Sequence, residues 1–226
     1  MIQRGGRQYI PRPATYEIVG PAPWAHLGLA DQAVTLETVR RAVIEHAPAR
    51  PAPDVPSARP TAVLVAVFEV DGDAWLVLTK RPDTMPSHQG QIAFPGGKYE
   101  AALDASLTDT ALREAEEEIA LGRDHVEIVG RLDGVGTMAS QFVITPFVGL
   151  LDAPVEFVAH PREVVTVFDV AVRELLGDEV FRRERWSGET NTLHLDMDFY
   201  ELPGETVWGA TARMLTNLLS WITGTS

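Results

Sequence analysis

The sequence predicts a mixed α/β (α+β) sandwich, in which a mixed sheet is flanked by helices. Apolar runs with the length of strands lie on both sides of one isolated amphipathic helix, predicted at residues 107–121. A second amphipathic helix is predicted near the end of the sequence, at residues 208–222. Strands that surround an isolated helix and precede a terminal helix indicate layers of both kinds of element packed on each other.

The length of 226 residues suits one domain with additions, and the composition divides it into two segments. We expect residues 1–58 to form an arm, a helix and a proline-rich linker, and residues 59–226 to form the main domain. The irregular start contains apolar and aromatic residues, so we expect it to pack on the domain or on a partner subunit. The helix is predicted at residues 35–47, with Thr35 as its N-cap.

The main domain begins with an almost wholly apolar run at residues 62–70, which predicts a buried strand. Asp71 and Gly72 then predict a hairpin turn. The other strands are predicted at residues 75–79, 91–94, 126–132, 142–151 and 164–168, followed by a short helix or turn at 170–176 and a hairpin of 182–186 with 192–200. Glycine and proline predict loops at residues 81–90 and 134–140.

The charge and composition exclude several classes of function. A net charge of −13 argues against binding to nucleic acid or to an anionic membrane, which requires a basic surface. The sequence has no cysteine, which excludes disulfides and thiol chemistry. No apolar run reaches membrane-spanning length and no signal peptide is recognisable, so we expect a cytoplasmic protein. The apolar residues of the arm suggest an interface, and we expect a homodimer.

The helix predicted at residues 107–121 carries three carboxylates on one face. Glu114, Glu117 and Glu118 are spaced at i, i+3 and i+4, beside a separate apolar stripe. Carboxylates at this spacing repel one another, and a divalent cation such as Mg²⁺ or Mn²⁺, which prefers oxygen ligands, would remove that repulsion. A solvated acidic face is the alternative interpretation of the same pattern.

Residues 113–118, Arg-Glu-Ala-Glu-Glu-Glu, lie downstream of Gly96-Gly97 and resemble the Nudix box. The resemblance implies a Nudix-like sandwich and a metal-dependent hydrolase that cleaves pyrophosphate bonds. It implies that Glu114, Glu117 and Glu118 bind Mg²⁺ or Mn²⁺. It also places Glu117, Glu118 and Arg113 in the catalytic group, with Arg113 bracing a carboxylate through a charge-assisted pair.

A second motif, at residues 78–97, resembles the accessory signature of the coenzyme A diphosphatase branch of Nudix hydrolases, as does Trp-Gly-x-Thr-Ala-Arg at residues 208–213. This resemblance implies hydrolysis of coenzyme A or an acyl derivative to 3′,5′-ADP and 4′-phosphopantetheine. The basic candidates for substrate contact are Lys80, Arg81 and Lys98. Gly96 and Gly97 are candidates because they would let the backbone turn sharply and approach the substrate closely.

The sequence departs from the family pattern before the acidic helix. The spacing from Gly97 to Arg113 is two residues longer than in the Nudix box, and Leu103 stands where the motif has Glu. Glu100 and Asp104 are the acids that would substitute for it. Pro82 and Pro86 also replace signature residues, Pro86 standing at a basic position. Two alternatives therefore remain: a Nudix hydrolase of ADP-ribose, nucleotide sugars or NADH, and a nucleotide-binding or regulatory module without turnover.

Three further polar residues are weaker candidates. Asp133, Gln141 and Glu163 follow or precede predicted strands, and one of them would serve as a base or a ligand. Ordinary surface positions are the alternative interpretation of all three.

Overall fold

The computed structural model describes residues 4–29, 32–84, 89–137, 141–187 and 194–226. Its helices and strands are β1 (Tyr16–Ile18), α1 (Leu36–Glu45), β2 (Arg59–Val70), β3 (Asp73–Lys80), β4 (Ile92–Ala93), β5 (Gly96–Lys98), α2 (Leu107–Ile119), β6 (Val126–Arg131), β7 (Val135–Thr137), β8 (Phe142–Leu151), β9 (Thr166–Ala171), α3 (Val172–Leu175), β10 (Phe181–Ser187), β11 (His194–Leu202), β12 (Glu205–Trp208) and α4 (Gly209–Thr223). Single 3₁₀ turns occur at Ala25–Leu27 and Arg123–His125.

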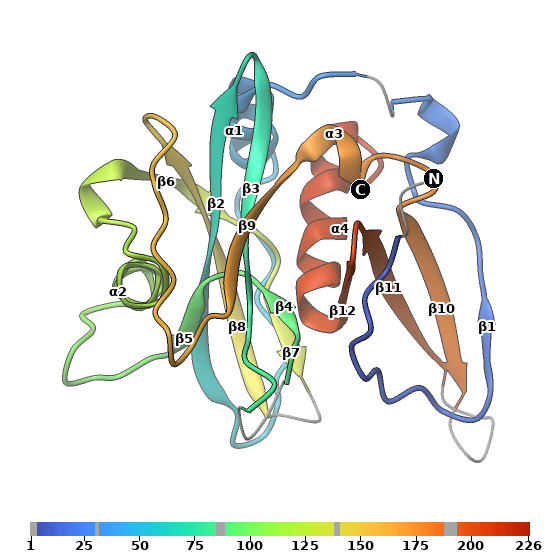
Figure 1. Cartoon of the computed structure of the whole chain (residues 1–226), viewed down its shortest axis with the longest axis horizontal. Coiled ribbons are helices and arrows are strands. Elements are labelled where there is room, and N and C mark those ends of the chain that lie inside the picture. Colours follow the sequence, from blue (N-terminus) through green and yellow to red (C-terminus); the bar gives the residue numbers. More distant parts are fainter. Residues whose placement is uncertain (1–3, 30–31, 85–88, 138–140, 188–193) are drawn as a thin grey trace.

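Two sheets and two long helices form the layers. The larger sheet has the order β4-β3-β2-β8-β6, with β5 on β2, β7 on β8 and β9 on β3; the smaller has the order β1-β10-β11-β12. The larger sheet is mixed, because β2 and β8 are parallel while its other pairs are antiparallel. Figure 1 shows α2 on one face of this sheet and α4 on the other, between the two sheets. The prediction of a mixed α/β sandwich with flanking helices is confirmed.

Strand β2 is buried on both faces, as its apolar run predicts. Ala62, Leu64, Ala66 and Phe68 belong to the core beneath α2, which also contains Ala111, Ala115 and Ile119. The alternate residues Val63, Val65 and Val67 belong to the larger core on the opposite face, with the buried side of α4. Because strand side chains alternate between faces, a run without polar residues satisfies both cores at once.

The N-terminal segment packs on the main domain of its own chain. Strand β1 pairs with β10, and Trp24, which is 1% exposed, lies in the larger core with residues of α1 and α4. Helix α1 begins as predicted, because the Thr35 hydroxyl accepts a hydrogen bond from the Thr38 amide at 3.2 Å. The two segments share one core, and their division at residue 58 stays a prediction.

Both long helices differ from prediction at their ends. Helix α2 stops at Ile119 rather than at residue 121, because Ala120 is left-handed with φ of 56°. The last helix runs from Gly209 to Thr223, and Trp208 instead ends β12. The loop predicted at 134–140 contains β7, and its last three residues lie outside the described part, as does the turn of the 182–200 hairpin.

Candidate active site

Helix α2 is held against the larger sheet in one orientation. Ser106 caps its start by accepting a hydrogen bond from the Asp109 amide at 3.2 Å. Ala111, Ala115 and Ile119 are fully buried against the sheet. This packing fixes the rotation of the helix, so that its acidic face lies beside β5 and the end of β3.

Glu118 is a buried carboxylate at the centre of this region. Its side chain is 4% exposed; Oε2 accepts a hydrogen bond from the Gly96 amide at 3.2 Å, and Oε1 lies 3.8 Å from Nη1 of Arg81. Burial raises the pKa of Glu118 to about 8, although the Gly96 amide and Arg81 oppose that rise. The charges of Glu114 and Glu163 contribute to the same rise.

Glu114 lies directly over Gly97. A Cβ atom at position 97 would be only 2.2 Å from Oε1 of Glu114, so a side chain there would displace the carboxylate. Burial raises the pKa of Glu114 despite its ion pair with Arg113, and the charges of Glu117 and Glu163 add to the rise. The space for Glu114 therefore depends on the absence of a side chain at position 97.

The two glycines do not form the sharp turn that was predicted. Gly96–Lys98 is strand β5, paired antiparallel with Thr61–Val63 of β2, and neither glycine has a positive φ. A Cβ at Gly96 would lie 2.4 Å from the carbonyl oxygen of Ala62. Glycine is thus required at position 96 by the neighbouring backbone and at position 97 by the carboxylate of Glu114. The sharp turn is the part of the prediction that is wrong.

Arg113 connects the preceding loop to the acidic face. Its Nε lies 2.7 Å from Oδ1 of Asp104 and its Nη2 3.1 Å from Oδ2, while Nη1 contacts Glu114 at 3.0 Å and Glu117 at 2.9 Å. The pair with Arg113 holds the pKa of Asp104 well below its usual range. Leu103 is 63% exposed. Asp104 is therefore the acid of this loop that pairs with Arg113.

The three basic candidates lie in different surroundings. Arg81 faces Glu118, and its buried Nε has no hydrogen-bond partner within the described residues. Lys80 forms an ion pair with Oε1 of Glu205 at 2.6 Å. Lys98 is exposed, with its Nζ 6.0 Å from the centre of the Phe142 ring. Arg81 thus lies beside Glu118, whereas Lys80 is engaged by its ion pair with Glu205.

Glu163 belongs to the loop that covers the end of α2. The His160 amide of this loop donates to the Glu118 carbonyl at 2.9 Å, and the Glu163 amide donates to the His160 carbonyl at 3.0 Å. Glu163 is close enough to raise the pKa values of Glu114 and Glu118. Asp133 instead bonds Arg50 and Asn217. The backbone carbonyl of Gln141 accepts a hydrogen bond from the amide of Arg59, the first residue of β2.

The donor set fits a hard divalent cation. Crowded, partly buried carboxylates with raised pKa values are stabilised as anions by such an ion. No group of three or more His, Asp or Glu side chains in the described ranges is already arranged as a cation cage. In this structure Glu117 contacts Arg113 and Glu118 contacts the Gly96 amide instead.

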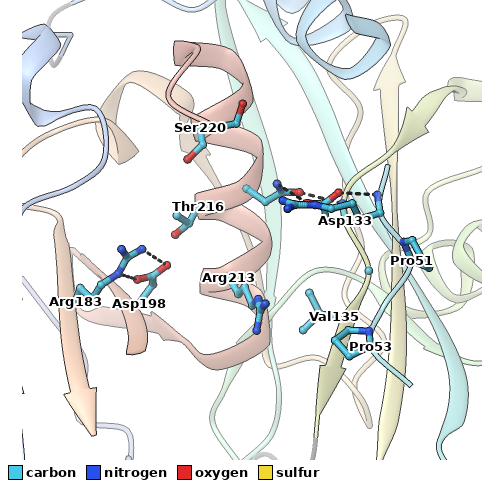
Figure 2. A pocket seen from close by; sticks show the side chains of 13 residues that line it. Pro51, Pro53, Asp133, Val135, Arg183, Asp198, Arg213, Thr216 and Ser220 are labelled. Carbon is cyan, nitrogen blue, oxygen red and sulfur yellow. Dashed lines mark hydrogen bonds and ion pairs between the residues drawn. The ribbon is translucent and has the colours of Figure 1, made fainter. Parts of the chain in front are cut away.

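The structure also contains a cavity of about 450 Å³ on the opposite side of the larger sheet, lined by α4, β7 and the proline-rich linker (Figure 2). Among the candidate residues, Asp133 lines this cavity, where it contacts Arg50 and Asn217, while the candidates on α2, β3 and β5 do not.

Comparison with known proteins gives the class of this protein. The NUDIX domain family matches residues 58–187, more than half of the chain. An uncharacterized Nudix hydrolase NudL of Yersinia pestis (strain Pestoides F) is 34% identical over 160 residues, which are 71% of this chain and 78% of that protein. A NudL of Yersinia pseudotuberculosis serotype O:1b matches equally well. The chain therefore belongs to the Nudix family, and it is a hydrolase of the pyrophosphate bonds of nucleoside diphosphate derivatives.

A solved structure shares the fold over most of the chain. The MutT/nudix family protein of Enterococcus faecalis aligns with a TM-score of 0.50 and 13% identity, covering 88% of this chain and 78% of that one. At this identity the likeness concerns the fold alone. No helix among the described residues is long and apolar enough to cross a membrane.

Proposed function

We propose that the chain hydrolyses coenzyme A or an acyl derivative with the help of Mg²⁺ or Mn²⁺, yielding 3′,5′-ADP and 4′-phosphopantetheine or its acyl form. The observation that carries the proposal is the contact of Glu118 with both Arg81 and the Gly96 amide. Glu118 belongs to the motif that resembles the Nudix box. Arg81 and Gly96 belong to the motif that resembles the coenzyme A signature, so the two motifs meet at one carboxylate.

The metal would be held by Glu114, Glu117 and Glu118. When bound, it would neutralise phosphate oxygens and lower the pKa of a coordinated water. The chain's own residues have to position these carboxylates. Arg113 contacts Glu114 and Glu117, and its guanidinium also donates to Asp104. Gly97 leaves space for Glu114.

Arg81 is proposed to bind the substrate's diphosphate. Its guanidinium lies at the end of β3 beside Glu118, and its side chain is 26% exposed, so the guanidinium can donate to a phosphate oxygen. Glu163 is proposed to accept the proton of the attacking water, because its charge is near enough to raise the pKa values of Glu114 and Glu118 and it is not held by a strong ion pair. Its contact in the described residues is His160, whose Nδ1 is 3.7 Å from Oε1.

The reaction adds one water across the P–O–P linkage. The water oxygen bonds to one phosphorus, the bridging oxygen leaves with the other, and the two products each carry a terminal phosphate. Glu163 would receive the proton of the water. Arg81 would compensate the charge that remains on the diphosphate oxygens.

Incubation of the purified chain with coenzyme A and Mg²⁺ or Mn²⁺, with product identification, tests this function. We expect both products in the presence of metal, and none from Glu118→Gln, whose neutral amide keeps the size of the side chain. Glu116→Gln is the matched control, because Glu116 is an exposed residue of the same helix. Coenzyme A left intact while ADP-ribose, a nucleotide sugar or NADH is cleaved would exclude this substrate.

We also propose a cytoplasmic homodimer that does not bind nucleic acid or membranes. The net charge of −13 supports the last two points. Exposed apolar side chains on the arm support an interface, since Ile18 of the edge strand β1 is 67% exposed and Tyr9 is 83% exposed. Light scattering of the full chain and of a chain without residues 1–58 tests both the dimer and the proposed division at residue 58.

A further inference from the structure

The cavity of about 450 Å³ lies on the face of the larger sheet opposite to α2, between α4 and the proline-rich linker (Figure 2). Its volume lies within the range of small-molecule sites. Its lining residues include Pro51, Pro53 and Val135 on one wall and Arg183 and Asp198 of the smaller sheet on another. Glu114, Glu117 and Glu118 of α2 are not in the lining, so a ligand here would not occupy the proposed catalytic site.

Helix α4 presents a polar stripe to this cavity. Arg213, Thr216, Asn217 and Ser220 are spaced at i, i+3, i+4 and i+7, and all four line it. The other faces of α4 are almost entirely buried and apolar. A stripe of donors on a core helix that faces a cavity is suited to a polar ligand.

Two members of the stripe are already engaged. The Thr216 hydroxyl bonds the Tyr200 hydroxyl at 2.8 Å and the Ala212 carbonyl at 3.0 Å. The Asn217 side chain accepts from the Asp133 amide at 3.0 Å. Within the described residues, the Arg213 guanidinium and the Ser220 hydroxyl have no recorded partner, although Ser220 is only 8% exposed. These two donors are seven residues apart, which is about 10 Å along a helix.

The charges of the cavity favour an anion at Arg213. Three arginines line it, and two of them are neutralised: Nε of Arg183 lies 2.6 Å from Oδ1 of Asp198, and Nε of Arg50 lies 2.8 Å from Oδ2 of Asp133. Arg213 is therefore the lining arginine that has no ion pair among the described residues, in a protein whose net charge is −13.

We infer that this cavity is a second ligand site, which binds a small organic phosphate. The guanidinium of Arg213 would bind the phosphate, because its planar fork matches two phosphate oxygens. The Ser220 hydroxyl would donate to an acceptor at the other end of the ligand, about 10 Å away. The apolar wall formed by Pro51, Pro53 and Val135 contacts the middle of the ligand.

Calorimetric titration of the full chain with AMP, without added metal, tests this site. AMP carries its phosphate and the acceptors of its base at opposite ends. We expect Arg213→Gln to weaken binding about tenfold or more, and Ser220→Ala to weaken it about threefold, as expected for a charged and a neutral hydrogen bond. Arg81→Gln, which alters the proposed catalytic site, should leave the affinity for AMP unchanged. Adenosine should not bind, and inorganic phosphate should bind with no dependence on Ser220.

Three results would overturn the inference. They are the absence of AMP binding at millimolar concentration, binding that Arg213→Gln leaves intact, and binding that Arg81→Gln removes. Arg213→Lys provides a second variant, which keeps the charge and loses the fork, and it should bind with intermediate affinity. Since the titration needs no turnover, its failure is distinct from a failure of the proposed hydrolysis.

Discussion

The guanidinium of Arg113 donates to both carboxylate oxygens of Asp104, with its Nε 2.7 Å from Oδ1 and its Nη2 3.1 Å from Oδ2. The same guanidinium reaches forward to Glu114 and Glu117. Asp104 is 4% exposed and also accepts from the Thr110 hydroxyl at 2.8 Å. The longer loop before α2 therefore still places an acid, Asp104, beside Arg113, one residue after Leu103.

Replacement of Asp104 should destabilise the fold. Asp104→Asn removes a charged partner from Arg113, whose side chain is 13% exposed, and we expect a loss of about 2 kcal/mol in the free energy of unfolding. Urea denaturation measures it. Glu100→Gln, at an exposed acid of the same loop, is the control and should change stability by less than about 0.5 kcal/mol. Equal effects of the two variants would exclude a specific role for Asp104.

The same pair predicts an acid-dependent loss of stability. The pKa of Asp104 is lowered in the folded chain, whereas an unfolded Asp titrates at about pH 4. The contribution is therefore complete above that pH and is lost as the pH falls toward the folded pKa. The stability difference between wild type and Asp104→Asn should shrink between pH 6 and pH 3. A difference that stays constant or grows over this range would contradict the pairing.

The contact between Gly97 and Glu114 predicts an effect on activity that exceeds the effect on stability. In Gly97→Ala the new Cβ would meet Oε1 of Glu114 at 2.2 Å, so the carboxylate must move. We expect kcat to fall about 100-fold, as a displacement of about 1 Å can cause. Unfolding free energy should change by less than about 1 kcal/mol, since the displaced atoms end a flexible side chain.

Gly122→Ala is the control for this substitution. Its added Cβ would find its nearest neighbour, a carbon of His125, at 3.6 Å, which is an ordinary contact. We expect normal activity from this variant. If both variants lose activity equally, the close approach of Gly97 to Glu114 has no specific role.

The end of α2 offers a stabilising substitution. Ala120 has φ of 56°, a conformation that disfavours side chains and in which helices commonly have glycine. Ala120→Gly should raise the free energy of unfolding by about 0.5 kcal/mol, the strain relieved being partly offset by the flexibility of unfolded glycine. Ala101→Gly, at an exposed turn residue without a positive φ, should not stabilise. Destabilisation by Ala120→Gly would contradict this explanation of the helix end.

The long elements could be predicted because their signals are local. Strand β8 was predicted with its observed bounds, and β2 and α2 within three residues of theirs, because each carries a continuous apolar or amphipathic pattern. Strands β1, β5, β7 and β12 have three or four residues each and were not predicted. Their pairing depends on partners far away in the sequence, such as Val63 opposite Gly96.

The candidate site was predictable in composition but not in its contacts. The i, i+3 and i+4 spacing places Glu114, Glu117 and Glu118 on one face, and the fold positions that face at β5. Glu205 lies 125 residues from Lys80, so no local pattern could reveal that the two residues form an ion pair. The choice of Asp104 over Glu100 likewise depends on the path of the loop, which spacing alone does not determine.

Hydrolysis of coenzyme A, with metal added and omitted, tests the central claim most directly. The account predicts 3′,5′-ADP and 4′-phosphopantetheine from the wild-type chain only when Mg²⁺ or Mn²⁺ is present, and no products from Glu118→Gln. ADP-ribose, nucleotide sugars and NADH, assayed in parallel, should be cleaved more slowly. Tight nucleotide binding without any product at high enzyme and metal concentrations would contradict the account.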